Sequence, residues 1–88
     1  MKINGLDVSV SFIDEDFGHM GGYNMEKSAI KVKKTLPKHT KLETVLHEVI
    51  ECIVHTNQLE LSHKDLTVLS MSLYQVLRDN GGAVGKWT

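Results

Sequence analysis

Near its start, over residues 6–12, the chain alternates apolar and polar residues with the period of two that a half-buried β-strand shows. Asn4-Gly5 supplies two residues that readily take the positive φ angles of a tight hairpin turn. After this turn, polar side chains at Asp7, Ser9 and Ser11 separate four apolar ones. The apolar side chains are Leu6, Val8, Val10 and Phe12. The pattern predicts a hairpin that continues into a strand with one buried face.

The segment HMGGYNMEKSAIKVKK predicts a second hairpin, with its turn near residues 26–28. Ile30 and Val32 fall on one face of its second strand, as the strand period requires. Gly21 and Gly22 have no side chains to pack, so we expect them to weaken or bulge the first strand. The edge of this hairpin is a candidate for pairing with an extended peptide.

After Pro37 the apolar period lengthens to that of an amphipathic α-helix. Thr40 and Glu43 have the spacing of a capping box, which predicts a helix over residues 41–56. Its apolar stripe consists of Leu42, Val45, Leu46, Val49, Ile50 and Ile53.

Ser62 and Asp65 have the cap spacing of a second helix, which we predict over residues 63–79. Asn80-Gly81-Gly82 is a typical helix stop, so residues 81–88 are expected to form a mobile tail. The predicted buried face of this helix consists of Leu66, Leu69, Leu73, Val76 and Leu77.

Strands over residues 2–34 followed by two helices predict a single α+β domain over residues 1–88. A small antiparallel sheet, built from the N-terminal hairpins, is expected to pack on the two C-terminal helices. The hydrophobic content of 41% and the charged content of 24% are those of a globular chain.

The charge and the cysteine count exclude several classes of protein. A net charge of −1 and a pI near 6.5 indicate neither a nucleic-acid partner nor a membrane surface. The chain has no apolar run of transmembrane length, and its start, MKINGLDVSV, does not resemble a signal peptide. Cys52 is the single cysteine, which suits the reducing cytoplasm. We expect a monomer or weak oligomer there.

Candidate chemistry is concentrated in the stretch LHEVIECIVH. A helix with His-Glu-x-x-His grips zinc between two imidazoles one turn apart. His47 and Glu51 occupy those two positions here, about 40° apart around the helix axis, so both can present a donor atom to one ion. Glu48 points to a different sector, from which a carboxylate can act as general base toward a zinc-activated water.

Catalytic zinc takes three protein ligands. His55 continues the row of His47 on the same helix, but one ion seldom spans the roughly 12 Å of such a row. His63 begins the next helix, which a short connection folds back against the first, so it is the better candidate. The predicted site is therefore one Zn²⁺ ion held by His47, Glu51 and His63.

The same residues have plainer interpretations. Glu48, Glu51 and His55 also suit the solvated face of an amphipathic helix, and His63 suits an ordinary first-turn position. Cys52 is best interpreted as a small buried side chain, because no matching base accompanies it.

The stretch LHEVIECI, followed after a short spacer by a helix that ends SLYQVLRDN, resembles the small zincin-like metallopeptidases of phages and bacteria. The likeness covers most of the chain, including a leading hairpin sheet and a G-Y-N-x-x-x-x-x-I strand. In that family a histidine ends the helix motif, and an acidic residue of the next helix completes the metal site. Here the order is exchanged, with the acid at Glu51 and the histidine at His63.

The resemblance implies a minimal zincin-like fold and a zinc-dependent hydrolase, a small phage-type metallopeptidase acting on a peptide or protein in the cytoplasm of the cell or of a phage host. Glu48 would be its catalytic base. The alternative is a catalytically inactive zincin-like binding module that sequesters a host or phage protein.

Overall fold

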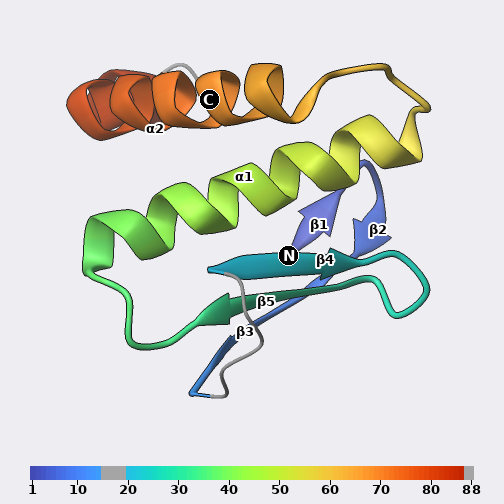
Figure 1. The fold of residues 1–88 in the computed structure, drawn as a ribbon. Helices are drawn as coiled ribbons and strands as arrows, with labels where there is room; N and C mark the ends of the chain where they lie inside the picture. The colour runs from blue at the N-terminus through green and yellow to red at the C-terminus, as the bar shows by residue number, and fades with distance from the viewer. Residues whose placement is uncertain (15–19, 87–88) are drawn as a thin grey trace.

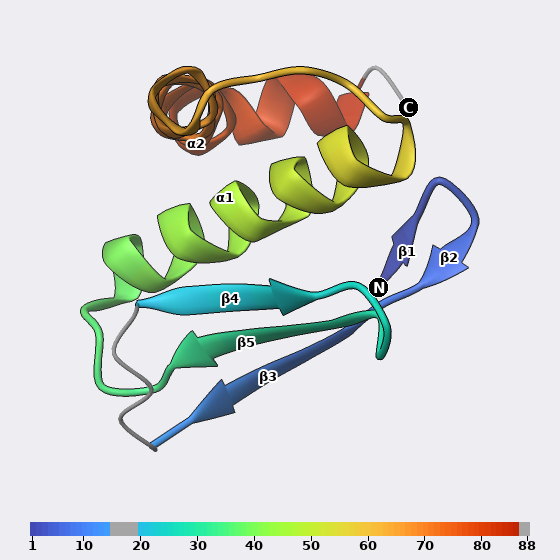
Figure 2. The ribbon, with the colours of Figure 1, turned by 45° about the vertical axis from the view of Figure 1, so that its right-hand side comes forward.

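The computed structural model describes residues 1–14 and 20–86, so the end of the predicted tail, residues 87–88, lies outside the described residues. The fold is α+β, as predicted, and its layers are a sheet, then helix α1, then helix α2 (Figure 1). The strands are β1 (Lys2–Ile3), β2 (Leu6–Asp7), β3 (Ser9–Ile13), β4 (Gly21–Asn24) and β5 (Ala29–Lys33). The helices are α1 (Lys38–Thr56) and α2 (His63–Lys86). Helix α1 lies between the sheet and α2 in both views (Figures 1 and 2).

The first predicted hairpin is confirmed. Strands β1 and β2 pair antiparallel, and the turn residues Asn4 and Gly5 have φ angles of 49° and 84°. An ion pair of 3.0 Å between Lys2 and Asp7 joins the ends of the two strands. This hairpin is therefore set by local turn chemistry.

The main sheet has the strand order β3-β5-β4. The predicted hairpin of β4 and β5 is confirmed, but β3 joins β5 in parallel, so this sheet is mixed and not purely antiparallel. Strand β5 takes the centre because it carries Ile30 and Val32, which have no exposed surface. A central strand is covered by neighbours on both sides, which suits its two most apolar positions.

Helix α1 begins at Lys38, three residues before the predicted start. The Lys41 amide donates to the Pro37 carbonyl oxygen over 2.9 Å, and no side chain caps this end of the helix. The predicted capping box is therefore wrong, because Thr40 already lies inside the first turn. Proline suits this boundary, since its φ is fixed and it has no amide hydrogen to leave unpaired.

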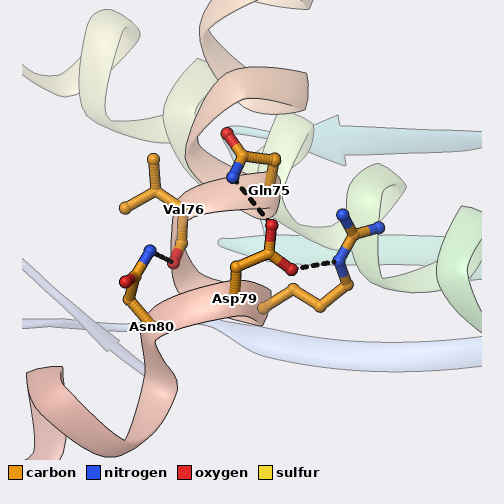
Figure 3. Close-up of polar contacts among 5 residues, drawn as sticks. Gln75, Val76, Asp79 and Asn80 are labelled. Carbon is orange, nitrogen blue, oxygen red and sulfur yellow. Dashed lines mark hydrogen bonds and ion pairs between the residues drawn. The ribbon is translucent and has the colours of Figure 1, made fainter.

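The start of α2 is confirmed, because the Ser62 hydroxyl oxygen accepts the amide of Asp65 over 3.0 Å. The predicted stop is a kink at Asn80, whose φ and ψ are −129° and 18°. The Asn80 side chain donates to the Val76 carbonyl oxygen, while Asp79 accepts from Gln75 and Arg78 (Figure 3). These bonds support the last turn before the kink, and the helix then resumes as far as Lys86.

Most of the predicted apolar face of α2 is exposed to solvent. Leu66 is buried, but the other four predicted core residues of α2 are 42–47% exposed. These four are Leu69, Leu73, Val76 and Leu77. Helix α2 instead turns Leu66 and Ser70 toward α1, and both are at least 95% buried. Since Leu73 and Leu77 lie on the same side of the helix as Leu66, burial decreases along α2 toward its C-terminal half, and Ser70 in the first half contacts His47 of α1.

Candidate metal centre

Helix α1 lies close on strand β4 because Gly21 has no side chain. A Cβ atom at Gly21 would lie 2.6 Å from Thr44 Cγ2 and 3.2 Å from the Lys31 carbonyl oxygen. Gly21 and Gly22 pair regularly with β5, so the bulge expected in this strand is not found. The close approach covers Glu48, whose Cγ would be 3.6 Å from the added atom.

Three side chains of α1 form a group that could hold a metal ion. His47, Glu48 and Glu51 each offer one ligand atom, and these atoms lie within 4.8 Å of one another. His47 Nε2 is 3.9 Å from the Glu51 carboxylate, as the one-turn spacing predicts. One imidazole and two carboxylates are donors that divalent cations such as zinc accept.

The Glu48 carboxyl is the most unusual group of the site. This residue is only 5% exposed, and its Oε2 atom is buried with no hydrogen-bond partner among the residues that the structure describes. Burial raises its pKa to about 7, and both the charge of Glu51 and a hydrogen bond with Glu51 act in the same direction. A buried oxygen without a partner costs folding free energy, and a cation bound beside it would offset that cost.

The His47 ring is held from the side of α2. The Ser70 hydroxyl donates to the Thr67 carbonyl oxygen over 2.9 Å, and its oxygen lies 3.5 Å from His47 Nδ1. Since the single hydroxyl hydrogen is already donated to Thr67, the Ser70 oxygen can act toward Nδ1 only as a hydrogen-bond acceptor. This arrangement favours the tautomer with a free lone pair on Nε2, which faces Glu51.

The electrostatic surroundings keep His47 neutral. Burial lowers its pKa from the ordinary value, the Glu51 carboxylate opposes this, and His63 lowers it further. A neutral imidazole is the form that binds a metal.

His63 lies beside His47, as the folded-back second helix predicts. The centres of the two rings are 5.3 Å apart, and the ring planes meet at 62°. His63 is exposed and is not part of the group formed by His47, Glu48 and Glu51. Its role as a metal ligand therefore stays a prediction.

A pocket of about 540 Å³ opens over this site between β4, α1 and α2. Three candidates for metal binding or catalysis line this pocket, namely His47, Glu48 and His63. The other residues that line it are Met20, Gly21, Thr40, Glu43, Thr44, Thr67, Ser70 and Met71. Because β4 is an edge strand of its sheet, the pocket adjoins backbone that can pair with an extended chain.

The remaining candidate residues lie elsewhere. His55 is exposed, with its ring 6.4 Å from that of Tyr23, and Cys52 is fully buried. The contribution of Ser70 to the site was not predicted, although its spacing from His63 on α2 was a signal. Gly21 was expected to weaken the strand, and its actual role depends on the approach of α1.

None of the family models, curated proteins or solved structures compared with this chain matches it. Among the described residues, no helix has the length and apolar character needed to cross a membrane. The chemistry of the site therefore carries the functional proposal.

Proposed function

We propose that this protein is a zinc-dependent hydrolase, a small zincin-like peptidase acting on peptide or protein substrates. The observation that carries the proposal is the buried, unpartnered Oε2 of Glu48 in the same group as His47 and Glu51. A structural carboxylate would be expected to have a partner or to face water. The cytoplasm is the proposed compartment, in keeping with the single cysteine.

His47, Glu51 and His63 are the proposed ligands. Bound zinc would supply Lewis-acid activation of a water molecule and of the peptide carbonyl. Ser70 orients the His47 ring through Nδ1, and the β4 edge holds the substrate in an extended form. This use of the ligands leaves Glu48 for proton transfer.

Glu48 is the proposed general base. It accepts a proton from the attacking water and passes that proton to the leaving amine. Without a bound cation its pKa is about 7, close to the pH at which a general base has to work. A bound cation would lower this pKa and favour the ionised form that accepts the proton.

The test is peptide cleavage by zinc-loaded wild type and by Glu48→Gln, with the exposed Glu60→Gln as control. The proposal expects cleavage by wild type and control, and a loss of at least about a hundredfold in kcat for Glu48→Gln. Equal cleavage by Glu48→Gln would contradict the assigned base. A His63→Ala protein that keeps all its zinc would contradict the ligand set.

The exposed apolar residues of α2 favour one second candidate, a zincin-like binding module that sequesters a protein without cleaving it. Surface patches of this kind often contact partners. Zinc binding by wild type, without any cleavage that depends on Glu48, would support this module over the peptidase.

A further inference from the structure

Glu43 lies in the pocket wall one turn before His47 on α1. It is half-buried, and among the described residues it has no ion pair or side-chain hydrogen bond. Both residues line the same pocket, so the Glu43 carboxylate is available to whatever occupies it.

The pocket that Glu43 lines also has apolar side chains. Met20, from the segment that leads into β4, and Met71 of α2 both line the pocket. Methionine is unbranched and adapts its shape to a ligand. Thr40 and Thr67 add short side chains, so the pocket combines flexible apolar walls with one free carboxylate. An aliphatic stem that ends in a cation, as in lysine or arginine, fits this combination.

The charges of the site lead to the same class of ligand. Among the described residues that line the pocket there is no lysine or arginine. A divalent cation held by the metal group would balance the charges of Glu48 and Glu51. The carboxylate of Glu43 then stays uncompensated, and Oε2 of Glu48, buried in the wall of the same pocket with no partner among the described residues, indicates that a ligand binds there.

We propose that Glu43 selects peptides with a lysine or arginine side chain close to the bond that is cleaved. The inference rests on the proposed hydrolase site, since that site defines where the peptide lies. Glu43 acts here as a specificity-determining residue: its carboxylate accepts hydrogen bonds from the ammonium or guanidinium group, while the stem packs on Met20 and Met71.

The experiment uses zinc-loaded protein and a set of eight-residue peptides that differ at one position. That position carries lysine, norleucine or glutamate and is moved through three residues on each side of the central bond. At one position kcat/KM for lysine should exceed that for norleucine by about tenfold, the size of one charge-assisted hydrogen bond. The ratio should fall to about one in Glu43→Gln, favour glutamate in Glu43→Lys, and stay unchanged in Glu60→Gln.

Equal values for lysine and norleucine at every position, or a preference that survives Glu43→Gln, would overturn the inference while leaving the hydrolase intact. If no peptide is cleaved, the affinities of the same peptides are measured on the zinc-loaded protein by fluorescence anisotropy. A preference for lysine in affinity that Glu43→Gln removes would support the selection by Glu43 and overturn only the hydrolase. Equal affinities would overturn the selection.

Discussion

The two helices of this protein have similar apolar patterns but bury different kinds of residue. Helix α1 buries Thr44 and Glu48 together with Cys52, whereas α2 leaves Leu69 and Leu73 more than 40% exposed. The periodicity of a helix thus indicates that it is amphipathic but does not decide which residues become buried. The burial of Glu48 works against folding and coincides with the candidate metal group, which is where functional demands are expected to override packing.

The largest expected effect comes from shortening a buried and an exposed leucine on the same side of α2, two turns apart. Leu66→Ala should lower the free energy of unfolding by about 2–4 kcal/mol, because Leu66 is 5% exposed. Leu73→Ala should cost less than about 1 kcal/mol, since this side chain keeps much of its contact with water. Urea unfolding of both variants measures the difference. Equal losses of unfolding free energy in the two variants, which become smaller when the protein concentration is lowered, would show that a second copy of the chain covers Leu73.

The next effect is the dependence of stability on pH at Glu48. Its pKa is about 7 in the folded protein against an ordinary value of 4.5, so the two states bind protons equally below about pH 4.5. Between these values the Glu48 carboxyl loses its proton in the unfolded chain but keeps it in the folded one. The free energy of unfolding therefore falls by up to about 3 kcal/mol as the pH rises toward 8.

In metal-free protein, Glu48→Gln should therefore be as stable as wild type near pH 4.5 and more stable by about 3 kcal/mol at pH 8. Urea unfolding at both pH values, in the presence of a chelator, provides the measurement. A Glu48→Gln protein that is less stable than wild type at pH 8 would show that the carboxylate has a stabilising partner.

A smaller effect is expected where α1 touches β4. Gly21→Ala should destabilise the protein by about 1–3 kcal/mol, because the new methyl group meets Thr44 and the Lys31 carbonyl oxygen. Gly22→Ala is the matched control, since a Cβ atom there meets nothing within 4 Å. Thermal unfolding of the two variants tests this pair. Equal melting temperatures would contradict the close approach of the helix.

The sequence was most informative where the interactions are local. The turn at Asn4-Gly5 and the cap at Ser62 depend on residues within a few positions, and both are confirmed. The parallel pairing of β3 with β5 joins Ser9 to Ala29 and depends on a whole-sheet arrangement. Local patterns do not contain that information, so the mixed sheet was not predicted.

The candidate site shows the same division. The one-turn spacing of His47 and Glu51 places them together, and the short connection between the helices places His63 beside His47. The contact between His47 and Ser70 joins two helices over 23 residues and depends on how these helices pack together. His63, Thr67 and Ser70 share one side of α2 at helical spacing, but this spacing does not show that Ser70 reaches the His47 ring, so the contact was not predicted.

The smallest expected effect concerns the contact between Ser70 and His47. Ser70→Ala should weaken zinc binding by about tenfold, because the hydroxyl no longer holds His47 Nδ1 and its tautomer. Ser72→Ala, on an exposed part of the same helix, is the control. Competition with a zinc-binding dye gives both affinities. An unchanged affinity in Ser70→Ala would mean that the backbone of α1 alone orients the ring.

The most direct test of the central claim is a calorimetric titration of zinc into metal-free wild type, His47→Ala and His55→Ala. His47 belongs to the candidate metal group, whereas His55 is exposed on the same helix and serves as the matched control. A metal centre on α1 predicts that wild type and His55→Ala each bind one equivalent of zinc, and that His47→Ala binds zinc at least about a hundredfold more weakly. The absence of zinc binding in wild type, or equal binding in His47→Ala, would contradict a metal centre on α1.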